Sequence, residues 1–331
     1  MMTSTRWRLV AFALLLGFGV VGGAIAVWRY APEPNPLTSV AGVDGRLNQL
    51  RSELGGQSIV GLELDVTVDA PNRAIEVQAH IQAESREAGR RRFAFLLNPG
   101  FMVTGVEVND RPARFVWSQG RLSVKMPDPV ASREIVTITV HYHGVPDARV
   151  LRSPSFTGSA CILPSLAFWH PFDLQSFFNV SMTVHAPEGW RVVSPRTAAI
   201  LTHGDGSATV SWQEERPVFG AALAVGQFSQ QSRIRGATYT TLYAPEGLHD
   251  AAVLLDRASR AYRALTELLG DDGFGYLQVV VSPDASRPFY AGGSTVVIPL
   301  AMANRAQTGT DHFMAVATPA ARIWWEGTVS G

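Results

Sequence analysis

Few residues of this 331-residue chain are spaced for metal or acid–base chemistry. His141 and His143 lie in VTITVHYHG and would share one face of a strand, where a His-x-His pair binds a metal only if further ligands converge. The same alternation turns the apolar partners of this stretch inward, namely Val136, Ile138, Val140 and Tyr142. We therefore favour two histidines on a solvated face over a metal site.

For three other candidate motifs we favour a structural role over a chemical one. His170, in Trp169-His170-Pro171, could be a ligand or a base, but a hydrogen-bonded corner residue is the better interpretation. Asp271-Asp272-Gly273 lacks the rest of a calcium loop, so we expect a turn. Gly292-Gly293 precedes a strand without the lysine and hydroxyl of a phosphate loop, which argues against nucleotide binding. No G-x-S-x-G nucleophile motif is present.

The elements that must position these residues are mainly strands up to about Gln231. Apolar and polar residues alternate in the stretches around 62–68 and 75–81, and turn residues such as Asp69-Ala70-Pro71-Asn72 separate the runs. Further runs follow through 221–228. Many short strands with regular turns predict a β-sandwich or an open, saddle-like sheet assembly.

The pattern changes near residues 235–245. A helical apolar stripe runs from Leu248 to Leu269 and ends at Gly270. Short β-branched runs at 276–281 and 295–300 predict strands, and a last helix is expected from Asp311 to about Trp325. Mixed α and β structure therefore follows the β-rich part.

The N-terminal region predicts export. Leu9 to Trp28 are 20 residues without a charge, enough for one membrane-spanning helix, with Arg6 and Arg8 before them. Ala24-Ile25-Ala26 instead resembles a signal-peptide cleavage site, so a signal anchor and a cleaved signal both remain open. Either places the body outside the cytoplasm, periplasmic or extracellular, and an anchor would make it a single-pass membrane protein. A proline-rich spacer at 31–36 and a short helix at 43–54 would follow.

The charge balance and the cysteine count limit the classes of partner and the kinds of cross-link or metal site that the chain could have. Lys and Arg number 28 and so do Asp and Glu, so the formal net charge is zero, and nothing favours nucleic acid as a partner. The single cysteine, Cys161, excludes an internal disulfide and a four-cysteine zinc site. We expect it to be a small buried apolar residue.

The order of six stretches resembles the zinc aminopeptidase family of gluzincins, the aminopeptidase N and leukotriene-hydrolase group. These stretches are LNPGFMVTGVEVND, VTITVHYHGVPD, FWHPFD, FNVSMTVHAPEGWRVVSP, VFGAALAVGQF and LTELLGDDGFGYLQVVVSP. The first five resemble the family's saddle-shaped N-terminal β domain. The sixth resembles the helix and strand that open its thermolysin-like catalytic domain.

The resemblance implies a substrate strand at Gly292-Gly293-Ser294-Thr295. In the family a Gly-x-Met-Glu-Asn segment lies along the substrate, and its glutamate holds the free α-amino group of the peptide. Thr295 occupies that carboxylate position here. A hydroxyl accepts a hydrogen bond but supplies no charge opposite an ammonium ion.

The resemblance also implies a zinc-binding helix at VATPAARIWWEG. The family has H-E-x-x-H, with two zinc ligands and a catalytic glutamate, before a Trp-Trp pair. Alignment on Trp324-Trp325 places Thr318, Pro319 and Arg322 at the His, Glu and His positions. Arg322 is permanently cationic and has no lone pair to donate. The family's third ligand would lie beyond Gly331, so we expect no zinc, no catalytic residue and no cofactor.

We therefore predict a membrane-tethered, aminopeptidase-like protein with a saddle-like β domain and a partial thermolysin-like α/β domain. The expected divisions are an anchor or signal at 1–30, a linker at 31–55, the β domain at 56–240 and the catalytic-type domain at 241–331. The favoured function is a non-catalytic binding module or fragment with a peptide or protein partner. A zinc metallopeptidase completed by sequence beyond residue 331 or by a partner chain remains open, as does an unrelated exported β module.

Overall fold

The computed structural model describes residues 54–150, 154–304 and 309–328. The expected N-terminal span at Leu9–Trp28 and the spacer at 31–36 lie outside the described residues, as does all but Leu54 of the short helix expected at 43–54. Among the helices of the described part, none is long and apolar enough to cross a membrane.

Alternating sequence patterns build the largest sheet. Among the described strands, eight pair in the order β13-β14-β11-β1-β2-β8-β4-β5. β1 and β2 are antiparallel with Val66 opposite Val77, whereas β1 and β11 are parallel with Leu64 opposite Met182. The strands are β1 (Gln57–Asp69), β2 (Ala74–Ser85), β4 (Phe101–Val108), β5 (Arg111–Pro112), β8 (Ile135–Gly144), β11 (Asn179–Ala186), β13 (Ala199–Thr202) and β14 (Ala208–Gln213).

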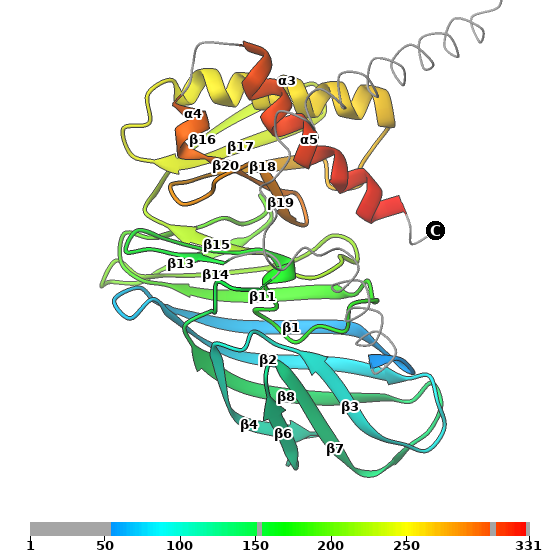
Figure 1. Ribbon diagram of the computed structural model, residues 1–331. Coiled ribbons are helices and arrows are strands. Elements are labelled where there is room, and N and C mark those ends of the chain that lie inside the picture. The colour runs from blue at the N-terminus through cyan, green and yellow to red at the C-terminus, as the bar shows by residue number, and fades with distance from the viewer. Residues whose placement is uncertain (1–53, 151–153, 305–308, 329–331) are drawn as a thin grey trace, which may run out of the picture. The chain divides into compact units, whose positions relative to one another are not determined.

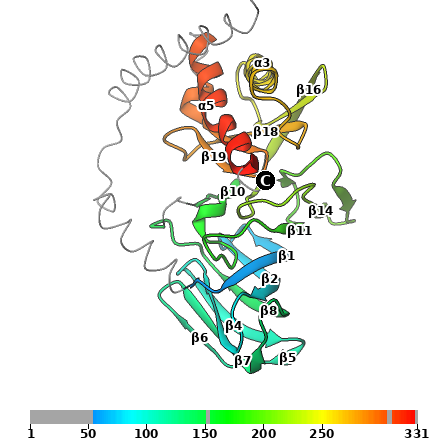
Figure 2. The same ribbon diagram turned by 90° about the vertical axis from the view of Figure 1, so that its right-hand side faces the viewer.

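A smaller sheet lies against the β4 and β8 side of the large one (Figures 1 and 2). Its described strands are β3 (Arg90–Leu96), β6 (Phe115–Ser118) and β7 (Arg121–Val130), in the order β3-β7-β6. The Trp117 indole on β6 donates a 3.0 Å hydrogen bond to the carbonyl of Phe101 on β4. Phe93 and Phe95 of β3 are fully buried, so this sheet supplies part of the core. The predicted mainly β first part is thus observed.

The connection to the second part is another small sheet. Its described strands are β9 (Ser155–Phe156), β10 (Ala160–Leu163), β12 (Arg191–Val192) and β15 (Leu223–Gly226), in the order β12-β15-β10-β9, and the short 3-10 turn η1 (Ser165–Ala167) follows β10. Cys161 on β10 is buried, as its apolar character predicts.

The second part is a five-stranded sheet, counted over the described residues, with helices on one face (Figure 1). Its strand order is β16-β17-β18-β20-β19, and β17, β18 and β20 are parallel. The elements are β16 (Phe228–Arg235), β17 (Thr238–Pro245), α3 (Ala251–Leu269), β18 (Tyr276–Ser282), β19 (Phe289–Gly292), β20 (Thr295–Pro299), α4 (Leu300–Ala303) and α5 (Gly309–Thr328).

The predicted order of helix, strand, strand and helix is therefore present. α3 ends where Gly270 adopts φ +92°, as the glycine predicts. The end of its apolar stripe is uncovered, since Leu268 is 66% exposed and Leu269 41%. The chain enters the second sheet at β16, immediately after β15, whereas the sequence pattern changes only near 235–245.

One apolar cluster joins the two parts, and residues 53–331 form a single compact unit. Ile162 and Val193 from the β part pack with Val280 and Val297 from the second sheet. The rest of the cluster is Ala160, Ala224, Phe228, Tyr243 and Ala291. This shared core fixes the five-stranded sheet against the strands that precede it.

Candidate functional site

The Gly292–Thr295 segment forms a tight hairpin turn between β19 and β20. Gly292 has φ +144° and Gly293 has φ +55°, and residues other than glycine rarely adopt these backbone conformations. A methyl group on Gly292 would lie 3.1 Å from Cβ of Ala222, so the first glycine also allows close backbone approach. The predicted strand after the glycines is present as β20, whereas the sequence pattern did not predict β19 as its hairpin partner.

The side chains of this turn point into a small polar cavity. Thr295 is buried and its hydroxyl donates a 2.8 Å hydrogen bond to Oε1 of Gln278 on β18. Ser294 is 2% exposed, and its hydroxyl has no hydrogen-bond partner among the described residues. Burial and the nearby Glu214 carboxylate raise the pKa of Tyr276.

Glu214 brings a carboxylate to the same cavity. It follows β14, and its amide donates to the carbonyl of Val180 at 2.9 Å. Oε1 accepts a 3.1 Å hydrogen bond from the Trp212 indole, while Oε2 is enclosed and has no partner among the described residues. A methyl group placed on Gly293 would lie 3.8 Å from that Oε2 atom. Desolvation raises the pKa of the Glu214 carboxyl.

The cavity has a volume of about 20 Å³, enough for one water molecule or one ammonium group. Apolar side chains enclose it beside the polar groups, namely Val193, Pro195, Trp212, Val218, Ala221 and Ala222. A carboxylate with a free oxygen, a free hydroxyl and an apolar wall favour a small cation that donates hydrogen bonds. Glu214 could not be singled out from the sequence, because an acidic residue after a strand, with no motif around it, is typical of a turn.

The segment that carries Glu214 also contacts α5. Arg216 donates from Nη2 to the carbonyl of Ile323 at 3.1 Å, and its guanidinium carbon lies 4.0 Å from the centre of the Phe274 ring. The hairpin turn, residues 214–216 and the second half of α5 are thus brought together.

On α5 the structure places Thr318 and Arg322 on an exposed side and buries Pro319. The helix packs on β19, β20 and α3, with Val316, Ala320 and Ile323 buried. The Trp324 indole donates to the carbonyl of Gly270 at 2.8 Å. The side chain of Glu326, four residues after Arg322, lies outside the described residues. The side chains of Thr318 and Arg322 are not suited to binding zinc, and Pro319 has no group that could transfer a proton.

The other candidates have structural roles. His170 is fully buried, accepts a 3.0 Å hydrogen bond from the amide of Ala221 at Nε2, and donates from Nδ1 to the carbonyl of Pro171. Burial lowers the pKa of His170 to about 4. Asp272 forms the predicted turn by accepting hydrogen bonds from the amides of Phe274 and Gly275, and it accepts another from the Tyr262 hydroxyl.

The predicted solvated face of β8 is present in part. His143 is exposed and His141 partly buried, while Thr139 is 3% exposed and bonds to His80. Thr139 lies on the same face of β8 as the two histidines, but the neighbouring His80 side chain on β2 covers it. Within the described residues, no group of three or more His, Cys, Asp and Glu side chains is placed to hold a metal ion.

Solved structures share this fold. An M1 zinc metallopeptidase from Deinococcus radiodurans matches with a TM-score of 0.66 and 16% identity, over 80% of this chain and 64% of that chain. A mutant bound to the substrate Tyr-Ser-Ala matches with a TM-score of 0.66 and 17% identity, over the same shares. A two-domain M1 mutant bound to L-arginine matches with a TM-score of 0.66 and 17% identity, over 79% and 64%. The chain thus spans less than two thirds of these proteins. No family model and no curated protein matches the sequence.

Proposed function

We propose that this chain, whose fold is that of the M1 zinc metallopeptidases, is a non-catalytic module that binds the amino end of a peptide. The observation that carries the proposal is the enclosed, unpartnered Oε2 of Glu214 beside the Gly292–Thr295 turn. The ligands in the related structures, L-arginine and Tyr-Ser-Ala, both carry a free α-ammonium group.

Glu214 supplies the charge that Thr295 lacks. An ammonium group in the cavity would donate to Oε2 of Glu214 and to the free hydroxyl of Ser294. A charge-assisted hydrogen bond of this kind contributes roughly 1.5–3 kcal/mol. Desolvation raises the pKa of the Glu214 carboxyl, and a bound cation would favour its ionised form.

The non-catalytic part of the proposal rests on α5. Thr318, Pro319 and Arg322 stand at the positions that the resemblance assigns to the zinc ligands and the base. A threonine hydroxyl is a poor zinc ligand, arginine has no lone pair to give, and proline has no group that activates water. The second candidate is a zinc peptidase completed by sequence beyond residue 331 or by a partner chain. This candidate is supported by the fact that the match covers only 64% of the related metallopeptidase chain.

The test compares binding with catalysis on the purified 331-residue chain. We expect calorimetric binding of Tyr-Ser-Ala and none of its N-acetyl form, because acetylation removes the ammonium charge. Glu214→Gln should weaken binding by about tenfold or more, since it removes a charge-assisted hydrogen bond. Glu215→Gln, at an exposed neighbouring acid, is the matched control and should bind normally.

Stability separates loss of binding from loss of folding. Because desolvation raises the pKa of Glu214, the ionised carboxylate destabilises the fold at neutral pH, so Glu214→Gln should unfold at the same or a higher urea concentration than wild type. Equal binding of the acetylated peptide would contradict the proposal. Stoichiometric zinc with chelator-sensitive cleavage of amino-acid anilides would establish the second candidate instead.

A further inference from the structure

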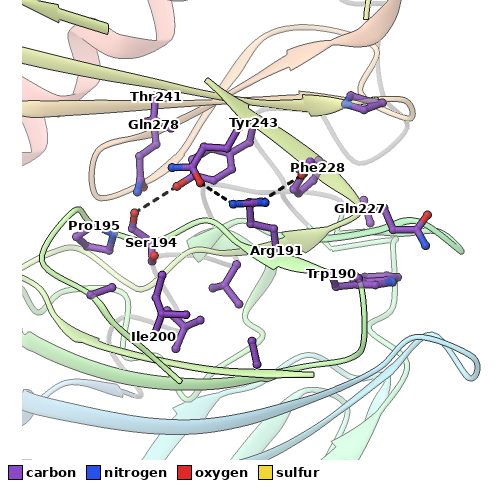
Figure 3. Close-up of a pocket in the computed structure, with 18 of the residues that line it drawn as sticks. Trp190, Arg191, Ser194, Pro195, Ile200, Gln227, Phe228, Thr241, Tyr243 and Gln278 are labelled. Atoms are coloured by element: carbon purple, nitrogen blue, oxygen red, sulfur yellow. Dashed lines mark hydrogen bonds between the residues drawn. The ribbon is translucent and has the colours of Figure 1, made fainter. Parts of the chain in front are cut away.

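A separate groove of about 850 Å³ opens between β13 and β14 on one side and the face of the five-stranded sheet on the other. Figure 3 shows it, with Ile200 on one side and Thr241 and Tyr243 on the other. Its volume lies within the range of roughly 300–1,000 Å³ that is usual for small-molecule sites. It borders the Glu214 cavity at Pro195 and Gln278, which line both.

The groove exists because the apolar cluster between the two parts fills only one end of the sheet. At that end Val280 and Val297 pack on Ile162 and Val193. Tyr243 belongs to both the cluster and the groove wall. From there the lining residues are polar or aromatic, namely Thr241 and Tyr239 on β17 and Gln278 and Tyr276 on β18. Alternate residues of a strand share one face, so this face is a continuous wall.

Two arginines give the groove its charge. Arg191, Arg196 and Glu246 are its charged lining residues, two positive against one negative. In the described part of the chain neither arginine forms an ion pair. Positive charge without a carboxylate partner is suited to an anionic ligand.

The arginines are positioned by contacts that leave donors free. Arg191 donates from Nε to the carbonyl of Phe228 at 3.3 Å and from Nη1 to Oε1 of Gln230 at 3.0 Å, and Figure 3 shows it crossing the groove towards Phe228. Its Nη2 group has no partner among the described residues. The guanidinium carbon of Arg196 lies 5.4 Å from the centre of the Tyr239 ring.

Tyr243 and Gln278 add polar atoms to the groove wall. The Tyr243 hydroxyl donates to the carbonyl of Ser194 at 3.5 Å, and burial raises the pKa of Tyr243 to about 12, so the hydroxyl stays protonated. Gln278 accepts from Thr295 through Oε1 and extends along the groove wall in Figure 3, which leaves its amide nitrogen for a ligand.

We propose that this groove binds a small organic anion with a planar or apolar body. Its carboxylate or phosphate group lies between Arg191 and Arg196. Its body packs on the rings of Tyr239 and Tyr243. This inference does not rest on peptide binding at Glu214, because it requires no ammonium group on the ligand.

The test uses ligands without a free amine, titrated calorimetrically into the full chain. N-acetyl-L-phenylalanine presents a carboxylate, phenyl phosphate presents a phosphate, and N-acetyl-L-phenylalaninamide is the neutral match of the first. We expect saturable binding of at least one anion, at least about tenfold tighter than binding of the amide, and weaker binding at higher salt. Tighter binding of the carboxylate would indicate an amino-acid or peptide anion, and tighter binding of phenyl phosphate a phosphorylated ligand.

Arg196→Gln is the decisive variant, because Arg196 is exposed and its side chain forms no hydrogen bond or ion pair among the described residues, so its loss should not disturb the fold. It should weaken anion binding by about tenfold or more. Arg91→Gln, at an exposed arginine on β3, is the matched control and should bind as wild type. The proposal is overturned if no anion binds at millimolar concentration, if the amide binds equally, or if Arg196→Gln and Arg91→Gln behave alike.

Discussion

At the scale of single residues, His170 illustrates how burial decides the role of a reactive side chain. Its two ring nitrogens bond to the backbone at Pro171 and Ala221, and the Trp169 indole bonds to the carbonyl of the same Ala221. The ring also packs edge-on against Phe172 and Phe178. The amide of Ala221 donates to Nε2, so His170 is the neutral tautomer with its proton on Nδ1.

The lowered pKa of His170 predicts loss of stability in mild acid. The folded value of about 4 lies below the ordinary value of 6.5, so the unfolded chain binds more protons between them. The contribution of His170, about 3 kcal/mol, is present above pH 6.5 and is lost as the pH falls towards 4. Urea unfolding at both ends of this range should show the loss.

The control for this prediction is His143→Asn, at an exposed position, which should keep the wild-type pH dependence. Imidazole nitrogen shifts by NMR provide a second readout. They should report a neutral His170 at pH 6, and a protonated ring at that pH would contradict the prediction.

At the scale of elements, α5 shows how packing fixes one side of a helix. The Trp324 indole donates to the carbonyl of Gly270, at the end of α3, and its ring lies 5.8 Å from that of Tyr262. Tyr262 in turn donates to Asp272 in the following turn. One side of α5 is therefore packed against the fold, and the side that carries Thr318 and Arg322 is exposed.

Trp324→Phe should cost about 1–2 kcal/mol of unfolding free energy, because it retains most of the ring packing but leaves the Gly270 carbonyl without its donor. Trp324→Ala should cost about 3–5 kcal/mol, because it also removes the ring. Chemical unfolding followed by circular dichroism measures both. Arg322→Ala, on the exposed side, should change stability by less than about 0.5 kcal/mol. Equal losses for all three variants would contradict this division of the helix.

At the scale of the whole described unit, the two sheets share a core and should unfold together. Ile162 on β10 is 1% exposed and Val280 on β18 is fully buried, and both belong to the same apolar cluster. The five-stranded sheet buries one of its faces in this shared cluster. That face therefore has no apolar core of its own.

Ile162→Ala should therefore destabilise both parts at once, by about 2–5 kcal/mol. We expect one calorimetric transition in wild type and variant, shifted to lower temperature in the variant. Hydrogen exchange should accelerate in α3 as well as in β10. Two separate transitions, or faster exchange confined to the β part, would show that the sheets are independent.

The sequence alone determined the element types and the structural residues, because these depend on local patterns. Alternating residues predicted β1, β2 and β8, and the stripe before Gly270 predicted α3. The Trp169-His170-Pro171 corner and buried Cys161 followed from residue chemistry. Thr295 and Thr318 could be singled out only because the order of the stretches resembled a family.

Only the tertiary structure decided which distant groups meet. Glu214 reaches the Gly292–Gly293 turn because β14 and β20 belong to sheets held together by a shared core, and no local pattern in a sequence encodes that approach. The groove at Arg191 and Arg196 likewise exists only where that core stops filling the space between the sheets. Local periodicity specifies faces, whereas cavities depend on how those faces are placed against each other.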